Sequence, residues 1–283
     1  MPAIKAILED TGLTEASVYP VHGGDINDAY CIITGTKKYS LKTNNAPGFP
    51  SMFEKEAAGL TALKNSTNLI IPAVIKYNVL NQEQYLLLEW IEKEKQTSVA
   101  AWENFGNKLA QLHQLPQSYY GWKEDNYIGS LVQANTQHNN WHNFYSECRI
   151  VPLAKQLFDK GSFTKNDIAA AESFCNKLEN LFPAESPALL HGDLWSGNMM
   201  FTAAGPAIYD PAVYYGHREM DIGMSALFGG FDEQFYAAYH NTYPLEKGWQ
   251  QRLPLTQLYP LLVHAVLFGG HYIRASALIV EKF

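Results

Sequence analysis

The segment LLHGDLWSGNMMF, residues 189–201, sets a polar stretch between two apolar runs, and the rest of the chain can be interpreted from it. It holds Asp193 and Asn198 five positions apart. The residues that follow, through AAGPAIYD, predict two short strands around Ala203–Gly205, because turn residues separate two apolar runs there. The polar stretch is therefore expected to be a loop that leads into a small hairpin.

Asp193, Asn198 and Asp210 together suit the chemistry of phosphoryl transfer. That reaction needs a carboxylate that handles the proton of the attacking hydroxyl, and oxygen ligands for a magnesium ion. Kinase catalytic loops have an Asp and an Asn at this spacing, so Asp193 is the predicted catalytic base, on a loop braced by His191. The hairpin returns Asp210 to Asn198, which makes these two the predicted metal ligands. On spacing alone, Asp193 and Asn198 could instead stabilise a turn.

Two charged residues and a glycine pair near the N-terminus are candidates for binding nucleotide phosphates. Lys42, in YSLKT, lies on a predicted strand, and Glu56 lies on the helix that follows. A kinase pairs a phosphate-binding lysine with a helix carboxylate in this way, although Glu54 is a neighbouring alternative. Gly23 and Gly24 would let backbone N–H groups approach phosphates, but two glycines alone are a weak signal.

The order of predicted elements indicates an α+β fold with two lobes. Residues 1–93 predict an amphipathic helix at the N-terminus and five antiparallel strands with one inserted helix, since apolar runs alternate with turn residues. The last of these strands is apolar enough to be buried on both faces. Residues 94–283 are mainly helical by their periodicity. The polar connector EKEKQT joins the lobes, and a cleft between them is the expected ligand site.

Composition excludes several other classes of protein. The 283 residues are 47% hydrophobic with a net charge of −7 and scattered basic residues, so no nucleic-acid partner is expected. The chain has no apolar run typical of a signal peptide or a membrane span, which predicts a cytoplasmic protein without a membrane partner. Cys31, Cys148 and Cys175 are far apart, and neither a disulfide framework nor a zinc site is expected.

Five segments resemble the fructosamine/ketosamine-3-kinase family of the protein-kinase-like superfamily, and this resemblance spans nearly the whole chain. They are PVHGGDINDAY (20–30), MFEKEAAGL (52–60), DNYIGSLVQANTQHNNWHNFYSECRI (125–150), LLHGDLWSGN (189–198) and YDPAVYYGHREMDIGMSALFGGF (209–231). The last three are specific to that family. HGDxxxxN alone would equally fit aminoglycoside phosphotransferases or choline kinases.

The resemblance implies an enzyme that uses ATP and Mg²⁺ to phosphorylate the 3-hydroxyl of a ketosamine, either a small molecule or a glycated protein. It assigns catalysis to Asp193, metal ligation to Asn198 and Asp210, and the phosphate-binding pair to Lys42 and Glu56. Adenine is expected on the backbone from Glu89 through Trp90 to Ile91. The sequence Asp210-Pro-Ala differs from the Asp-Phe-Gly of protein kinases and suits small-molecule kinases. We expect a monomer.

Several alternatives stay open at this point. An aminoglycoside- or choline-type kinase is one, and a non-catalytic, kinase-like binding module is another. Trp195 is either a packing residue or a wall for the sugar. In GHREMD (216–221), His217 is expected nearer the substrate, while Arg218 and Asp221 brace the catalytic loop. LFGGF (227–231) and the C-terminal tail are interpreted as helix ends and core, with no chemistry.

Overall fold

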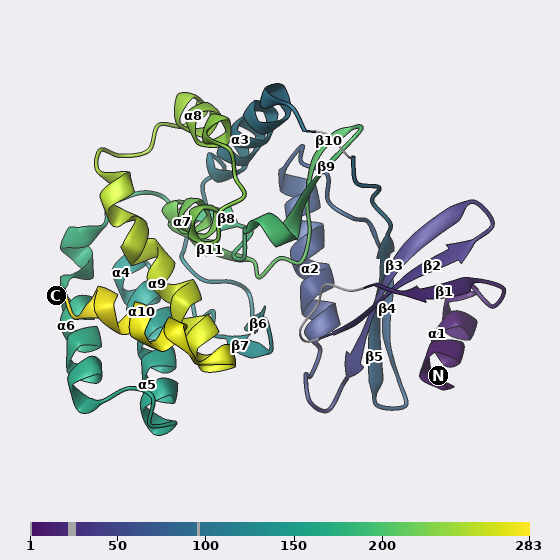
Figure 1. Cartoon of the computed structure of the whole chain (residues 1–283), viewed down its shortest axis with the longest axis horizontal. Coiled ribbons are helices and arrows are strands. Elements are labelled where there is room, and N and C mark those ends of the chain that lie inside the picture. The colour runs from purple at the N-terminus through teal and green to yellow at the C-terminus, as the bar shows by residue number, and fades with distance from the viewer. Residues whose placement is uncertain (1, 22–26, 95–96) are drawn as a thin grey trace.

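The computed structural model describes residues 2–21, 27–94 and 97–283, with a β-sheet on one side and helices on the other (Figure 1). The sheet side contains α1 (Pro2–Thr11), β1 (Ser17–Pro20), β2 (Asp28–Thr34), β3 (Lys37–Asn45), α2 (Met52–Ser66), β4 (Val74–Leu80) and β5 (Glu83–Glu89). The helical side contains α3 (Val99–His113), β6 (Asn126–Ile128), β7 (Leu131–Gln133), α4 (Trp141–Tyr145), the π-helical turn η1 (Ser146–Ile150), α5 (Val151–Asp159), α6 (Lys165–Leu181), β8 (Ala188–Leu190), the 3₁₀ turn η2 (Ser196–Asn198), β9 (Met199–Thr202), β10 (Gly205–Ile208), β11 (Tyr214–Gly216), α7 (Glu219–Leu227), α8 (Glu233–Thr242), α9 (Trp249–Phe268) and α10 (His271–Val280).

The five-stranded sheet confirms the antiparallel arrangement expected from the sequence. Its strand order is β1-β2-β3-β5-β4, so the central strand is β3. Lys42 lies on β3 opposite Ala29 of β2 and Leu86 of β5. A lysine paired on both sides is held by two ladders, which fixes where its side chain leaves the sheet.

Strand β5 is buried on both faces, as its apolar run predicted. Leu86 and Leu88 belong to the large hydrophobic core that continues through α2 into the helical side. Tyr85 and Leu87 belong to a separate small core under α1. Successive side chains of a strand point to opposite faces, so a continuous apolar run is what a strand between two cores requires.

The hairpin of β9 and β10 joins the two sides of the molecule. The N–H of Ile70 donates to the carbonyl of Pro206 at 3.0 Å, and the N–H of Ile208 donates to the carbonyl of Ile70 at 3.0 Å. Figure 1 shows this hairpin beside α2. The polar segment in front of the hairpin is therefore held against the sheet side. A lobe boundary between residues 93 and 94 stays a prediction.

Some elements were not expected from the sequence. The two-stranded pairs β6–β7 and β8–β11 have strands of three residues each, which are too short to show a period. Helix α7 begins at Glu219, inside the GHREMD segment, for which no helix was predicted. Within the described residues, no helix is both long enough and apolar enough to cross a membrane.

Candidate active site

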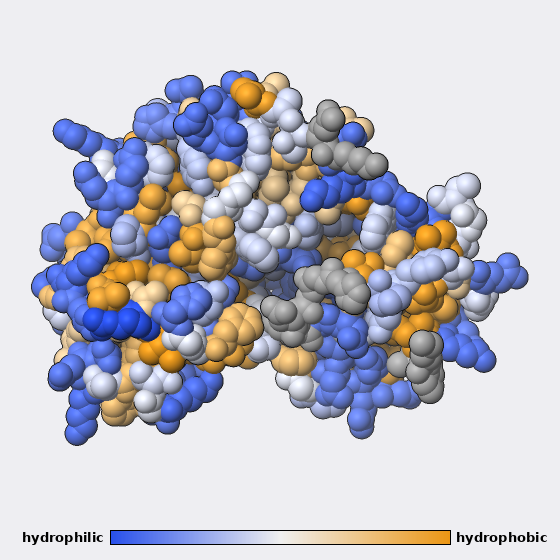
Figure 2. Space-filling model, viewed as in Figure 1, coloured by the Kyte–Doolittle hydropathy of each residue, from blue (hydrophilic) through white to orange (hydrophobic). Residues whose placement is uncertain are grey.

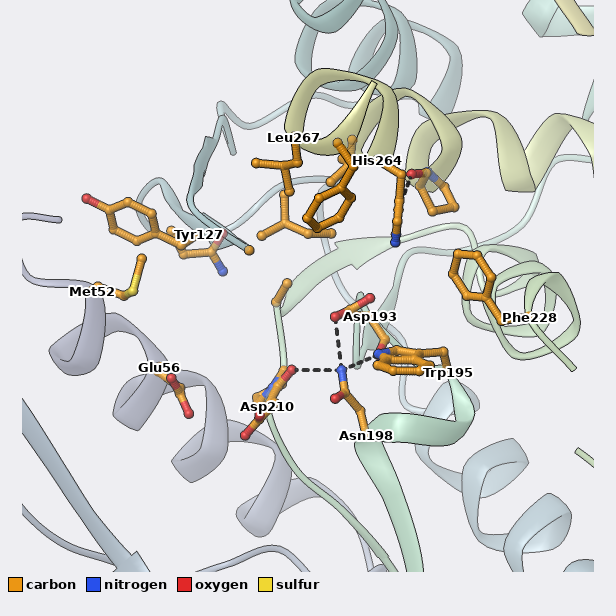
Figure 3. A pocket seen from close by; sticks show the side chains of 18 of the residues that line it. Met52, Glu56, Tyr127, Asp193, Trp195, Asn198, Asp210, Phe228, His264 and Leu267 are labelled. Carbon is orange, nitrogen blue, oxygen red and sulfur yellow. Dashed lines mark hydrogen bonds between the residues drawn. The ribbon is translucent and has the colours of Figure 1, made fainter. Parts of the chain in front are cut away.

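A pocket of about 670 Å³ opens where the sheet side meets the helical side. Figure 2 shows the molecule hollowed between these two sides. The pocket is lined by Glu56 from α2, by Asp193, Trp195 and Asn198 from the polar loop, and by Asp210 after β10 (Figure 3). The structure thus brings together residues from three separate segments, as the sequence predicted.

The loop that carries Asp193 is closed by its own side chains. The Nδ2 of Asn198 donates to the carbonyl oxygen and to Oδ2 of Asp193, both at 2.9 Å (Figure 3). The N–H of Asn198 donates to the carbonyl of Trp195 at 3.0 Å, and the N–H of Tyr209 donates to the carbonyl of Asn198 at 3.1 Å. The Asp–Asn spacing therefore has a geometric reason, since residues 193–198 form one turn that the side chain of Asn198 closes.

A glycine and a histidine fix the start of this loop. Gly192 has a φ of +82°, and an added Cβ would lie 2.0 Å from the carbonyl oxygen of Ala212, so only glycine fits. His191 is fully buried, and its Nε2–H donates to the carbonyl of Tyr209 at 2.9 Å. Burial lowers the pKa of His191, which keeps the ring neutral and lets its Nδ1 accept the N–H of Asp193 at 3.3 Å.

Asp221 of α7 supports the loop from below. Its carboxylate accepts the N–H of His191 at 2.7 Å and the N–H of Gly192 at 2.9 Å, and it is 1% exposed. Burial alone would raise the pKa of Asp221, but the hydrogen bonds and charges around it, from His113 above all, hold it below its usual value. The bracing expected of Asp221 is therefore a direct contact with the catalytic loop.

Lys42 links the sheet to the pocket through two carboxylates. Its Nζ lies 2.7 Å from Oε1 of Glu56 and 2.6 Å from Oδ1 of Asp210. Burial would lower the pKa of Lys42, but Asp210 and Glu56 outweigh it and raise the pKa, so the lysine stays charged. Glu54 is exposed. The alternative between Glu54 and Glu56 is settled geometrically in favour of Glu56.

Asp210 has an unusual backbone for a residue other than glycine. Its φ is +57°, in the left-handed region that costs free energy for an L-residue. Such a conformation persists where the neighbouring chain fixes it. The carbonyls of Ala212 and Val213 are held by side-chain amides: Gln133 donates to Ala212 at 3.0 Å and Asn126 donates to Val213 at 2.8 Å.

These two amides belong to a larger buried network that sequence reasoning missed. Asn126 accepts from Gln133 and from Asn135, each at 2.8 Å. Asn135 in turn accepts from Arg149 of η1 at 2.8 Å, and Arg149 is fully buried over the ring of Tyr214. A signal was present in the sequence, because these amides lie among apolar residues, where buried polar groups must find partners.

The environment of Asp193 suits a general base. Burial raises the pKa of this carboxyl to about 7, opposed by the hydrogen bond from Asn198 and reinforced by the charges of Asp210 and Asp221. A carboxylate with a pKa near neutrality takes up a proton more readily than an ordinary aspartate while still being ionised in part.

Two oxygens of the site have the chemistry that a magnesium ion needs. Among the described residues, neither Oδ1 of Asn198 nor Oδ2 of Asp210 accepts a hydrogen bond, because Asn198 donates through its nitrogen and Asp210 binds Lys42 through its other oxygen. The described residues hold no cluster of three or more His, Cys, Asp or Glu for a metal. Mg²⁺ commonly takes only one or two protein ligands beside phosphate oxygens, so this pair fits it.

The predicted adenine-binding segment follows the end of β5. Glu89 is the last residue of the strand, and its N–H donates to the carbonyl of Ala73 at 2.9 Å. Trp90 and Ile91 are half-buried, and Ile91 makes no backbone–backbone hydrogen bond to any other part of the chain that the structure describes. Within those residues, its N–H and carbonyl therefore have no backbone partner. Gly23 and Gly24 lie outside the described residues.

His217 and Arg218 do not lie in the pocket. His217 is fully buried, its Nε2 faces the carbonyl of Pro183 at 3.3 Å, and a substrate contact does not follow from this position. Arg218 binds Glu185 through two hydrogen bonds of 2.8 Å and the carbonyl of Tyr243 at 2.7 Å. It braces the chain around α8 and does not contact the catalytic loop.

The structure adds pocket residues that were interpreted as helix ends or core. Phe228 follows α7, and His264, Phe268 and Tyr272 lie on α9 and α10, and all four line the pocket. Periodicity assigned these segments to helices correctly, but it does not tell which helical residues face a cavity that another segment forms.

Comparison with known proteins agrees with this geometry. A family model described as fructosamine kinase matches residues 3–283. A probable ketoamine kinase of Vibrio parahaemolyticus serotype O3:K6 is 37% identical over 286 residues, which covers 99% of this chain and 98% of that protein. A crystal structure of a protein assigned as a fructosamine-3-kinase, from Thermobifida fusca, superposes with a TM-score of 0.88 at 32% identity and covers 99% of this chain and 98% of that one.

A more distant likeness concerns the fold. An aminoglycoside phosphotransferase, in a ternary complex with AMP-PNP and hygromycin B, has a TM-score of 0.68 at 16% identity and covers 100% of this chain and 99% of that one. The protein-kinase-like α+β fold expected from the sequence is thereby confirmed. The match over the full length, at the identities above, shows that the chain belongs to the fructosamine kinase family.

Proposed function

We propose that this protein transfers the γ-phosphoryl group of ATP to the 3-hydroxyl of a ketosamine. One observation carries the proposal: in a chain of the fructosamine kinase family, the ion pairs of Lys42 with Glu56 and Asp210 meet the closed Asp193–Asn198 loop at one pocket. These are the parts that phosphoryl transfer requires, namely a cation for phosphates, oxygen ligands for a metal and a base for the acceptor.

Each of the site residues has a distinct role in this mechanism. Asp193 orients the sugar hydroxyl toward the γ-phosphate and accepts its proton. Lys42, kept charged by its two carboxylates, binds the α- and β-phosphates. The backbone at Ile91 binds adenine. Most of the rate then comes from holding the hydroxyl and the phosphate in line.

A magnesium ion would be held by Oδ1 of Asn198 and Oδ2 of Asp210, and when bound it offsets the negative charge that develops on the phosphate oxygens. Asn198 has a second task in the protein itself, because its Nδ2 fixes Oδ2 of Asp193 at 2.9 Å. One side chain therefore couples the position of the metal ligand to that of the base.

The chemistry of the 3-phosphorylated ketosamine indicates how this product breaks down. A ketosamine has a ketone at C2 and an amine at C1, so a phosphate on C3 becomes allylic when the ketone enolises toward C1. Elimination then expels inorganic phosphate, and hydrolysis of the remaining conjugated imine frees the amine. Phosphorylation at C3 would in this way remove a sugar adduct from an amine or from a protein.

A panel of acceptors tests this proposal. ADP release is measured with ATP, Mg²⁺ and one acceptor at a time: a ribulose–lysine adduct, a fructose–lysine adduct, kanamycin and choline. We expect turnover of one or both ketosamines and none of kanamycin or choline. Equal turnover of kanamycin and a ketosamine would contradict the proposal, and absence of turnover with all four at saturating ATP would favour a non-catalytic binding module.

A further inference from the structure

One wall of the pocket is a continuous row of aromatic rings, which we call the aromatic row. It runs from Trp195 on the catalytic loop to Phe228, His264, Phe268 and Tyr272. Ring centroids lie 6.1 Å apart between Trp195 and Phe228 and 5.0 Å apart between Phe228 and His264. His264 then lies 5.6 Å from Phe268 and 5.0 Å from Tyr272. In Figure 3, Phe228 and His264 lie on the same side of Asp193 as Trp195, away from Glu56.

The row contains most of the exposed Phe and Trp side chains in the part of the chain that the structure describes. Among the described residues, four Phe or Trp side chains are classed as exposed, and three of them, Trp195, Phe228 and Phe268, belong to the row. Phe268 is 53% exposed. Single exposed apolar residues are ordinary, but an exposed cluster that continues into a pocket indicates a binding surface. Of the rings in the row, only Trp195 lies on the loop that carries the proposed catalytic base.

Two glycines shape the turn at the far end of the row. Helix α9 ends at Phe268 and α10 begins at His271, and the two residues between are Gly269 and Gly270, with φ of +67° and +61° and ψ of −135° and −140°. An L-residue rarely adopts this conformation. An added Cβ would meet nothing closer than 3.9 Å at Gly269, so the backbone, not crowding, requires glycine there. This turn between α9 and α10 brings Phe268 and Tyr272 to the same wall of the pocket.

His264 gives the row a polar atom that faces the pocket (Figure 3). Nδ1 of His264 lies 2.7 Å from the carbonyl of Pro260, so that nitrogen carries the proton and Nε2 is left as an acceptor. Burial lowers the pKa of His264, which favours the neutral ring. In Figure 3, Asp193 lies between the row and Asp210, and both Asp210 and Glu56 lie on the side away from Phe228. The pocket therefore has an acidic, polar end and an apolar, aromatic end.

A ketosamine has the same two-part character. Its sugar carries hydroxyls, and its C1 nitrogen, two carbons from the reacting C3, carries whatever substituent the amine brought. With the 3-hydroxyl at Asp193, that substituent has to leave the catalytic loop in some direction, and Trp195 is the first ring in one such direction. A protonated amine also interacts favourably with ring faces.

We propose that the aromatic row is the subsite for the amine substituent of the ketosamine, and that it selects substituents that are aromatic or bulky and apolar. This inference rests on the proposed function and names the substrate class within it. Continuity of the row with the catalytic loop is the reason to assign it to the substrate and not to a second copy of the chain. A small polar substituent would leave the exposed rings in water, whereas an aromatic one covers them.

The experiment compares two synthetic ketosamines with the same sugar, one made from benzylamine and one from methylamine. We expect kcat/KM to be roughly five- to tenfold higher for the benzylamine adduct, the size of one aromatic contact. Phe268→Ala should lower this ratio toward one, because the benzylamine adduct loses more than the methylamine adduct. Phe268→Tyr, which keeps the ring, should retain the ratio.

Phe158→Ala is the matched control, since Phe158 is an exposed phenylalanine on α5 that lines another surface, and it should leave both rates unchanged. A wild-type ratio near one, or a ratio that Phe268→Ala leaves unaltered, overturns the subsite. A second result would also overturn it: Phe268→Ala halves the molar mass measured by light scattering but leaves the kcat/KM ratio of the two adducts unaltered. The row would then be an interface between two copies of the chain. Turnover of neither adduct contradicts the proposed function itself.

Discussion

The two sides of the pocket are built in opposite ways. Beneath the catalytic loop, buried side chains pair with the backbone: Asp221 accepts from two N–H groups, and Asn126 and Gln133 donate to two carbonyls. We call this the braced side. On the other side, the aromatic row makes few hydrogen bonds and leaves Trp195 and Phe268 exposed. The groups beneath the catalytic loop form their hydrogen bonds within the protein, whereas the aromatic row has exposed surface that a ligand can cover.

This difference separates catalysis from the choice of acceptor. Phosphoryl transfer requires groups held to within a fraction of an ångström, and a buried hydrogen-bond network provides such rigidity. Recognition of an acceptor requires surface that becomes covered only on binding. Variants on the braced side should therefore change rate and stability, and variants on the aromatic side should change acceptor affinity.

The largest effect is expected at the base. Asp193→Ala should lower kcat by about 10²- to 10⁴-fold, because the carboxylate acts on the acceptor hydroxyl in the transition state. ATP affinity, measured by calorimetry, should change little, since Asp193 has no role in nucleotide binding. Asp159→Ala, which removes an exposed ion pair on α5, is the control. Near-normal turnover by Asp193→Ala would remove this residue from its role.

The next largest effect is expected at Lys42, which in the proposed mechanism contacts the phosphates directly, whereas Glu56 acts only through Lys42. Lys42→Met should lower kcat/KM by roughly 100-fold, because a charge aimed at the phosphates is lost. Glu56→Gln should cost about tenfold, since the carboxylate only positions the lysine and Asp210 still holds it. Glu54→Gln on the exposed side of α2 is the matched control. A larger loss for Glu54→Gln than for Glu56→Gln would contradict the ion pair.

Asp221 tests the braced side through stability. Asp221→Asn replaces an acceptor of two N–H groups by an amide with only one acceptor atom, so one buried donor is left unpaired. The free energy of unfolding in urea should fall by roughly 1–3 kcal/mol. Phe228→Ala on the exposed row should change it by less than about 0.5 kcal/mol. Equal losses would mean that the two sides do not differ as described.

Much of this site could be predicted from the sequence, for a physical reason. Asp193, Asn198 and Asp210 lie on one loop and its hairpin, where spacing along the chain fixes spacing in space. Lys42 and Glu56 follow from a strand and the next helix. The aromatic row could not be predicted in this way, because Phe228 and Phe268 come to one wall, on either side of His264, only through the packing of α7 against α9.

Trp195 sits where the two sides meet and should show a binding effect. Trp195→Ala should raise the ketosamine KM about fivefold, equivalent to about 1 kcal/mol for one aromatic contact, with kcat reduced less. The ATP KM should stay nearly unchanged. Trp195→Phe, which keeps an aromatic face, should recover part of the affinity. An unaltered ketosamine KM in Trp195→Ala would remove this residue from the acceptor site.

The smallest effect concerns acid stability and the buried His217, outside the pocket. Burial lowers the pKa of His217 from its usual 6.5, against the opposing charges of Glu185 and Glu219. The unfolded chain therefore binds this proton more readily than the folded one, so stability is lost as pH falls below about 6.5. His217→Gln should reduce the slope of unfolding free energy against pH between 6.5 and 5. An unchanged slope would show that His217 is protonated equally in both states.

The position of the transferred phosphate tests the account most directly. The protein is incubated with ATP, Mg²⁺ and a ribulose–lysine adduct, and the mixture is followed by phosphorus NMR with proton coupling. We expect a phosphate ester coupled to the proton on C3, which later decays to inorganic phosphate as the amine is released, and at least about 100-fold slower ester formation with Asp193→Ala. An ester on another hydroxyl, or inorganic phosphate formed without any ester, would contradict the account.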